Sequence, residues 1–484
     1  MGKKLSPTRI FTKQQVNNLL NATIGKTLLE VDYAELFKLY EGKTKVTGIA
    51  GEIIEISVLG CEMDNRQDPD IIVDNIKTEL KTTGMIKPKK QQSPYLFECK
   101  EPVSVTAVSI DKIVNENFEN SNFWHKLEHI LWVYYWYNSN VTVKLEGYKN
   151  FKIIGFQFYE FNNSDRLTLR QDWLIVRDFL IDIHNNFKTE DERKKQYPRL
   201  SHELRSQLML IDTAPKYPNP PRFRLKRAFA TVIADRYFKN RHYEHLSQPI
   251  TKYSEIDEKC KIMNEKYKDK TFKEIASILG TELTQTKNFA ETLVIKMFGS
   301  DAKSLNSIED FAKIGLMAKC VPLRENGSIK EDTKLFMPNL LEWIDESTFE
   351  NSALYSFFAE RQFILIIYQH IGREVVFKKI KRVFFNEEMI FQSVKPLWDQ
   401  VRYLITSKKL KIVRKLNQDG SEKRNKSGTV QESPNFPKSA NFDTFLRGSA
   451  TKTEDKYKTL CINGLKMLPQ YVWLSRRIIK KFID

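Results

Sequence analysis

The chain has 484 residues, of which 41% are hydrophobic and 12% aromatic, and this composition excludes a disordered or fibrous protein. Its length exceeds that of one ordinary core and favours two domains of about 200 to 250 residues each. The formal net charge of +17 favours a polyanionic partner, and nucleic acid is the leading candidate. A basic but inert surface is the alternative that charge alone leaves open.

The sequence has neither an apolar run of about 18 residues nor the apolar stretch of a signal peptide behind its N-terminus. We therefore expect a soluble, cytoplasmic protein without a membrane partner. The five cysteines are scattered and show no CxxC spacing, so they predict neither a disulfide framework nor a zinc site.

The predicted elements mix helices and strands along the first half of the chain. Apolar residues at helical spacing predict a helix that begins at Thr12 and ends near Gly25, and a second helix over 165–183. Stretches rich in β-branched and aromatic residues predict strands at 78–82, 103–110, 129–137, 141–145 and 151–159. This mixture predicts an α/β or α+β fold.

The composition also predicts the division into domains. Residues 1–240 form the predicted first domain, the charged stretch 241–269 a linker, and residues 270–484 the second domain. Within the second domain, residues 417–441 have few apolar side chains and predict a mobile basic loop.

One short segment has the residue types needed to hydrolyse a phosphodiester bond. Asp70 is followed by Glu79 and Lys81, and side chains two residues apart on a strand point to the same face. Carboxylates can hold Mg²⁺, while a lysine can orient water and stabilise negative charge. The Glu-x-Lys pattern is weak by itself, because further copies, such as those at 41–43, 192–194 and 454–456, are typical of solvated ion pairs.

The order of several blocks along the chain makes this signal more specific. The sequence resembles the MutH family, which holds a mismatch-repair nicking endonuclease and two-domain restriction enzymes that cut GATC. The resemblance covers roughly residues 10–240 by motif, and the blocks that carry it are Ile53–Gly60, Pro69-Asp70, Glu79-Leu-Lys81, His125–Trp132, Leu169–Trp173 and Phe223–Phe229.

The resemblance implies a restriction-endonuclease-like core in the N-terminal half. In that core Glu55, Asp70, Glu79 and Lys81 would form the active site, with Asp70 and Glu79 as Mg²⁺ ligands, and Lys126 would assist from the facing strand. A surface lysine beside a buried strand is the alternative for Lys126. Eight residues separate Asp70 from Glu79, two more than in the family pattern, so Asp74 is an alternative ligand.

Specificity in this family resides in a loop after the long helix. Lys216 and Asn219 match its spacing, and lysine can donate to guanine while asparagine can pair with adenine, which fits a GATC target. Arg224, Lys226 and Arg227 follow as predicted phosphate contacts that add affinity rather than sequence choice. A solvent-exposed basic helix start is the alternative for these three.

A degenerate second copy of the fold is predicted at an offset of about 240 residues. In it Val294 stands for Glu55, Asp310 for Asp70, Met317 for Glu79 and Glu360 for Lys126. Without the carboxylate pair this half should bind metal poorly, and we expect it to bind DNA without cutting it. A purely architectural domain is the alternative.

The sequence as a whole therefore predicts a Mg²⁺-dependent type II restriction endonuclease that makes double-strand breaks in DNA, at GATC. Its expected partners are double-stranded DNA and, in function rather than by contact, a methyltransferase of the same restriction-modification system. The chain is expected to be a monomer that can dimerise on DNA. A mismatch-repair nicking enzyme and a non-catalytic DNA-binding regulator are the alternatives.

Overall fold

The computed structural model describes residues 9–43, 48–62, 69–88, 95–108, 110–139, 143–216, 219–282, 288–345, 348–425, 428–448 and 455–484. The chain divides into an N-terminal unit, Met1–Glu255 with Asn306–Gly315, and a C-terminal unit, Ile256–Leu305 with Leu316–Asp484. The predicted linker contains helix α10 (Tyr253–Tyr267). No described helix combines the length and the apolar character that crossing a membrane requires.

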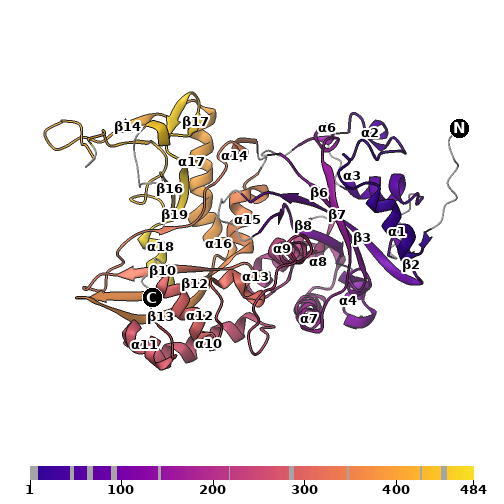
Figure 1. Cartoon of the computed structure of the whole chain (residues 1–484), viewed down its shortest axis with the longest axis horizontal. Helices are drawn as coiled ribbons and strands as arrows, with labels where there is room; N and C mark the ends of the chain where they lie inside the picture. The colour runs from indigo at the N-terminus through magenta and orange to yellow at the C-terminus, as the bar shows by residue number, and fades with distance from the viewer. Residues whose placement is uncertain are drawn as a thin grey trace. The chain divides into compact units, whose positions relative to one another are not determined.

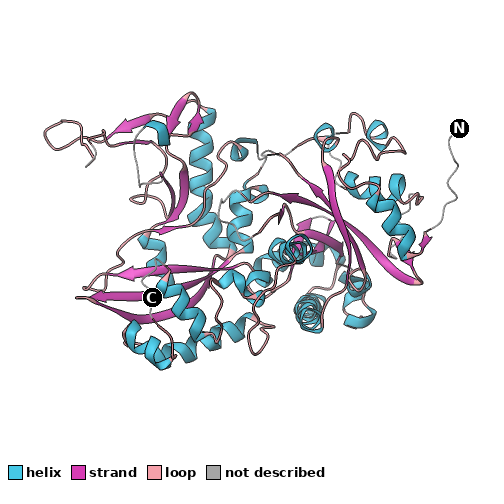
Figure 2. Cartoon of the chain, viewed as in Figure 1, coloured by secondary structure: helices cyan, strands magenta, loops and turns pink. Residues whose placement is uncertain are grey.

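The N-terminal unit is built on a mixed sheet of order β1-β2-β3-β6-β7 (Figures 1 and 2). Strand β4 pairs with the last residues of β3, Met85 and Ile86. Strand β3 pairs in parallel with β6, which pairs antiparallel with β7. A second, antiparallel sheet has the order β5-β9-β8. The strands are β1 (Ile10–Phe11), β2 (Ile71–Val73), β3 (Ile76–Ile86), β4 (Glu98–Cys99), β5 (Val103–Ala107), β6 (Ile130–Trp136), β7 (Lys152–Tyr159), β8 (Ile211–Lys216) and β9 (Asn219–Leu225).

Helices cover both faces of the larger sheet, because alternate residues of its central strands are apolar on both sides. Leu80, Leu131 and Val133 share a core with the first helices of the chain. On the opposite face the ring of Tyr134 stacks on that of Tyr237 from α9, with 5.7 Å between centroids. The helices are α1 (Lys13–Asn21), α2 (Leu36–Leu39), α3 (Ile49–Glu52), the π-helix η1 (Ile53–Val58), α4 (Ile110–Ile113), η2 (Phe118–Asn120), α5 (Asn122–His125), α6 (Leu145–Tyr148), α7 (Asn163–Asn186), α8 (Glu190–Leu204), α9 (Arg227–Lys239) and α13 (Glu309–Lys313).

The mixed α/β class predicted from the sequence is confirmed. The predicted helices correspond to α1 and α7, and four of the predicted strands to β3, β5, β6 and β7. The strand predicted at 141–145 is wrong within the described residues, since Val143 and Lys144 have no regular structure and Leu145 begins α6. The β-branched residues that suggested it are too few to form a pairing edge.

The C-terminal unit contains a sheet of order β10-β12-β13, in which β10 and β12 are parallel and β12 and β13 antiparallel. A second sheet has the order β11-β19-β16, and two further pairs are β14-β15 and β17-β18. The strands are β10 (Leu316–Leu323), β11 (Thr333–Lys334), β12 (Gln362–Ile371), β13 (Glu374–Phe384), β14 (Ile412–Arg414), β15 (Glu432–Pro434), β16 (Thr444–Gly448), β17 (Leu460–Ile462), β18 (Leu465–Met467) and β19 (Gln470–Leu474).

Helices of this unit pack on its sheets through a core that includes Trp343, Phe363 and Trp398. They are α11 (Phe272–Ile278), α12 (Phe289–Met297), α14 (Glu342–Asp345), η4 (Phe349–Asn351), α15 (Ala353–Glu360), α16 (Glu387–Met389), the π-helix η5 (Ile390–Val394), α17 (Lys395–Thr406), η6 (Asp455–Tyr457) and α18 (Arg476–Ile483), with η3 (Leu305–Ser307) at the unit boundary.

Asp310 does not occupy the place predicted for it. It lies in helix α13, which belongs to the N-terminal unit and packs on α9, whereas Asp70 lies in the turn that leads into β2. The six-residue spacing that suggested the match runs through a helix and a turn, not through a strand pair. Asp310 is therefore no structural counterpart of Asp70.

Candidate active site

Strand β3 brings the two residues of the Glu-x-Lys motif to one face, as predicted. Glu79 is 3% exposed, and its Oε1 accepts a hydrogen bond from Lys81 Nζ at 2.5 Å. Leu80, between them, packs into the core on the other face. A buried carboxylate requires a compensating positive charge, so the period of the strand and the pairing of these two residues support each other.

Lys126 contacts the same carboxylate from a different element. Its Nζ donates to Glu79 Oε2 at 2.7 Å, and its side chain is only 10% exposed. The contact fits the predicted assisting role, but the element differs: Lys126 is the C-cap of helix α5, and β6 begins four residues later at Ile130. Because Lys126 is buried, the alternative interpretation of it as a surface lysine is excluded.

Asp70 is held next to the motif by a backbone hydrogen bond. Its Oδ2 accepts from the Leu80 N–H at 2.8 Å, which fixes the carboxylate beside Glu79. Burial and the negative charge of Glu79 raise the pKa of Asp70, whereas Lys81 and Lys126 oppose that rise. Asp74, the alternative ligand, lies in the β2–β3 turn with a φ of 47°, and its Oδ1 accepts from the Lys13 N–H at 3.2 Å.

Glu55 is linked to Asp70 by an arginine, Arg9, that the sequence analysis did not single out. Arg9 Nη1 lies 3.2 Å from Glu55 Oε1 and donates to the Asp70 carbonyl oxygen at 2.6 Å. Arg9 Nη2 donates to the Glu62 carbonyl oxygen at 2.5 Å. One guanidinium thus links three segments of the chain around the site. No sequence motif surrounds Arg9, so only the fold reveals it.

Glu55, Asp70 and Lys81 line one cavity of about 270 Å³. Gly51 forms part of its wall, where an added Cβ would lie 3.4 Å from Thr82 Oγ1. Glu79 and Lys126 are buried next to this surface, and Glu79 contacts Lys81 of the wall. The site therefore combines three carboxylates with two ammonium groups.

The donor chemistry of this site suits a hard divalent cation. Among the described residues, no three His, Cys, Asp or Glu side chains lie close enough together to hold one ion. Mg²⁺, however, commonly binds through one or two carboxylates and completes its shell with water and substrate phosphates. The oxygens of Asp70 and Glu79 match that requirement.

The predicted DNA-contacting residues lie on or just after the β8–β9 hairpin. Lys216 and Asn219 pair with each other across it, although their side chains fall outside the described part of the chain. Arg224 forms a two-pronged ion pair with Asp212, at 2.8 and 2.9 Å. The hairpin runs along β5, where Arg222 Nε donates to Ser104 Oγ at 2.9 Å, and Ser104 lines the cavity.

Lys226 and Arg227 differ in their surroundings. Lys226 is 3% exposed and donates from Nζ to the Leu208 carbonyl oxygen, so a structural role fits it and the predicted phosphate contact does not. Arg227 begins helix α9 and is half-buried. Of the two, only Arg227 retains access to solvent.

Comparison with known proteins agrees with this geometry. Residues 59–172 match the family model described as DNA mismatch repair enzyme MutH. The predicted resemblance to the MutH family is confirmed. The chain is also similar to the type II restriction enzyme Sau3AI of Staphylococcus aureus, with 25% identity over 418 residues that cover 83% of this chain and 80% of that enzyme. The match to the MutH model includes Asp70, Glu79, Lys81 and Lys126.

Proposed function

We propose that this protein is a type II restriction endonuclease that uses Mg²⁺ to hydrolyse phosphodiester bonds of double-stranded DNA at a short specific site, GATC. The observation that carries the proposal is the buried Glu79 carboxylate held between Lys81 and Lys126, beside Asp70. Buried charges are costly unless they are paired, so a four-membered charged cluster at a cavity is typical of a site used for chemistry.

In the proposed mechanism Asp70 and Glu79 would hold the cation, which would supply positive charge against the negative charge that builds up on the phosphate. Lys81 orients the attacking water and stabilises developing negative charge. Lys126 acts as a positioning residue, because it holds the second oxygen of Glu79. Arg9 positions Glu55 in the same way.

DNA would meet this site along the β8–β9 hairpin. Lys216 and Asn219 would read bases from its tip, and Arg227 would contact phosphate at the start of α9. Arg224 would need to loosen its pair with Asp212 to contact phosphate, so we assign it a smaller share of the affinity. A methyltransferase of the same system would protect the host DNA at the target sequence.

We also propose that the C-terminal unit is a degenerate copy of the N-terminal one that binds a second stretch of DNA. Its β10-β12-β13 sheet repeats the pairing directions of β3-β6-β7. Met317 pairs with Phe363 next to the start of β10, as Glu79 pairs with Ile130 in β3. The sequence Phe-Glu-Asn-Ser precedes the central strand in both units, at Phe118 and at Phe349.

Cleavage of unmethylated plasmid DNA in Mg²⁺ tests the enzyme. Wild type and Met317→Ala should give linear DNA with defined ends, and Glu79→Ala should give none. Of the two substituted residues, only Glu79 is a proposed metal ligand. Sequencing of the ends identifies the target. DNA that all three proteins bind and none cuts would refute the nuclease and favour a regulator.

The same assay distinguishes the second candidate function. The match to the mismatch-repair enzyme model favours a nicking activity as that candidate. Such an enzyme would convert supercoiled plasmid to open circles and leave it there, whereas a restriction enzyme proceeds to linear DNA.

A further inference from the structure

A second cavity, of about 520 Å³, lies in the C-terminal unit. Strands β14, β15, β16, β18 and β19 contribute to its wall. Its volume is in the range of about 300–1,000 Å³ that small organic ligands occupy. Five of its lining residues are cationic, and one is acidic: Lys415, Lys438, Arg447, Lys458, Lys466 and Glu432.

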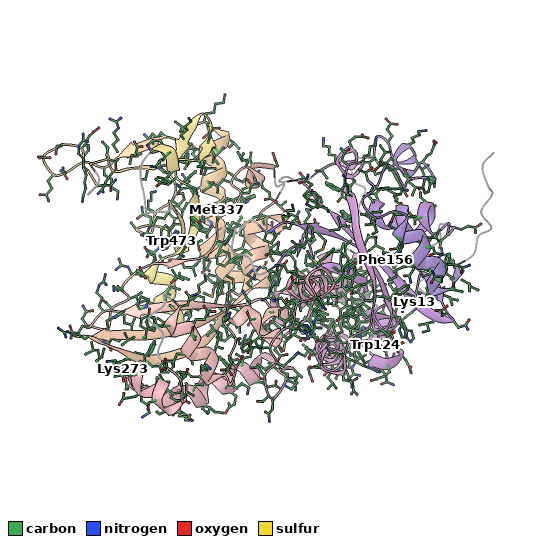
Figure 3. All side chains as sticks on the ribbon, viewed as in Figure 1. Lys13, Trp124, Phe156, Lys273, Met337 and Trp473 are labelled. Atoms are coloured by element: carbon green, nitrogen blue, oxygen red, sulfur yellow. The ribbon has the colours of Figure 1, made fainter. Side chains whose placement is uncertain are left out.

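The positive charge of this cavity is only partly balanced. Lys458 forms an ion pair of 2.6 Å with Glu432, and Arg447 forms one of 2.6 Å with Asp332. Arg447 also lies over the ring of Trp473, labelled in Figure 3, at 4.8 Å from its centroid. Lys415, Lys438 and Lys466 add three further charges to the wall. An anion would relieve their mutual repulsion.

Lys438 shows this repulsion between cations most clearly. Partial desolvation, together with the positive charges of Lys415 and Arg447, lowers the pKa of Lys438 to about 8, although this residue is exposed. Two of the three causes are repulsions between cations, so a phosphate group placed among them would stabilise all three charges. The concave wall makes this a site for one group rather than a diffuse basic surface.

Gln470 adds a second, independent observation. It lines the same cavity and is 2% exposed, and its Nε2 donates to the Leu468 carbonyl oxygen at 2.8 Å. Its Oε1 is buried without a hydrogen-bond donor among the described residues. A buried acceptor without a partner is costly, so a ligand N–H would improve the site. The phosphodiester group of DNA has no hydrogen-bond donor, whereas a nucleobase has.

We propose that this cavity binds one nucleotide unit of a DNA strand, with the phosphate among Lys415, Lys438 and Arg447 and a base N–H directed at Gln470. The inference deepens the proposed DNA binding by the C-terminal unit and rests on it for the source of the nucleotide. A free nucleotide offers the same chemistry, and the experiment separates the two sources.

The arrangement of the chain around the cavity supports a strand as the ligand. Residues 412–434, predicted in part as a loop, carry β14 and β15 and two isolated bridges, Leu416 with Glu422 and Arg424 with Val430. Lys415, Lys423 and Arg424 lie along this arm, and Arg424 and Lys415 are exposed. A basic arm beside a cavity can follow a phosphate backbone in both directions.

The test measures binding to the full-length protein in a Glu79→Ala background, which prevents cleavage. The probes are a fluorescent duplex with one GATC site, deoxyadenosine monophosphate and inorganic phosphate. Lys438→Gln should weaken binding of the second duplex molecule about tenfold and reduce the salt dependence of that step by about one phosphate contact. Lys480→Gln, on α18 outside the cavity, removes the same charge and should change affinity less than twofold.

A pH series adds a readout that a structural role would not give. Duplex affinity of the Glu79→Ala parent should fall between pH 7 and pH 9, because Lys438 loses its proton there, and Lys438→Gln should remove this fall. If Lys438→Gln does not fold, Lys415→Gln on the exposed arm replaces it.

Each outcome decides the proposal. Loss of both duplex and monophosphate binding in Lys438→Gln supports a site for a nucleotide of DNA, and loss of monophosphate binding alone supports the site but assigns it a free nucleotide. Unchanged binding of every probe overturns it. Plasmid cleavage by the wild type with unchanged binding in Lys438→Gln would refute this inference alone, whereas nucleotide binding by a protein that never cuts would refute the nuclease alone.

Discussion

Strands β3 and β10 share one pairing pattern, since each pairs in parallel with a strand that pairs antiparallel with a third, although β3 also pairs with β2 and β4. At the start of this pairing β3 carries Glu79 and Lys81, and β10 carries Met317 and Lys319. Lys81 contacts a carboxylate, whereas Lys319 donates to the Lys334 carbonyl oxygen at 2.9 Å. The strand pairing thus does not depend on the charged cluster.

This difference explains where buried charge is retained. Replacing a buried ion pair by apolar side chains is often neutral or stabilising, so the pairing of β3 would not require this cluster for stability. Met317 pairs within the sheet in β10, and its side chain packs against the core of the C-terminal unit. The cluster around Glu79 is therefore best explained by chemistry.

The largest effect should come from the lysines of this comparison. Lys81→Met should lower the single-turnover cleavage rate by about 10²–10³-fold, the range found when one charge-stabilising group is removed. Lys319→Met, at the matching place in β10, should leave the rate unchanged. Quench-flow cleavage of a one-site duplex measures both, and equal losses would show that the two units share the chemistry.

A buried charge that serves structure alone provides the next test. Lys313 contacts the carboxylates of Asp165 and Glu309, and all three side chains are at most 5% exposed. Lys313→Met should lower the free energy of unfolding by about 3–5 kcal/mol, because Asp165 remains buried without its cation, although Glu309 keeps its pair with Arg236. Urea unfolding measures this loss.

The matched control is Lys194→Met, which removes a lysine from an exposed pair with Glu190. Such surface pairs contribute little to stability, so its urea midpoint should match that of wild type. A Lys313→Met protein as stable as this control would contradict the structural role of the buried cluster.

The smallest effect concerns pH. Burial and Glu79 raise the pKa of Asp70, so the cleavage rate should fall on acidification at a higher pH than an ordinary aspartate, of pKa about 3.9, would give. The sign follows because only the ionised carboxylate binds Mg²⁺. Raising the Mg²⁺ concentration tenfold should move this acid limb to lower pH, by up to about one unit, since metal and proton compete. A limb that stays in place would exclude Asp70 as a ligand.

The sequence predicted the parts of the site that depend on local geometry. The two-residue period of a strand was enough to put Glu79 and Lys81 on one face, and β-branched and aromatic residues marked β6 correctly. Long-range partners were not accessible in this way. Arg9 acts on Glu55 and Asp70 only because β1 pairs with β2, and no local pattern encodes that pairing.

Lys226 and Lys126 show the opposite limit. A basic block before a helix predicted phosphate contacts, but Lys226 is drawn inward by the Leu208 carbonyl oxygen and by the buried Asp172 nearby. The family resemblance implied that Lys126 assists from the facing strand, yet the turn that ends α5 brings its ammonium to Glu79. Charge can be read from a sequence, but its direction depends on the fold.

The short segment Asn306–Gly315 has a consequence for how this protein can be divided. It belongs to the N-terminal unit, although the chain on both sides of it belongs to the C-terminal unit. A gene cut after residue 255 would therefore encode a first half that lacks Lys313 and leaves Asp165 without its cation. The two units are each compact but are not separable as genetic modules, and any exchange of one unit between relatives would have to carry this segment with it.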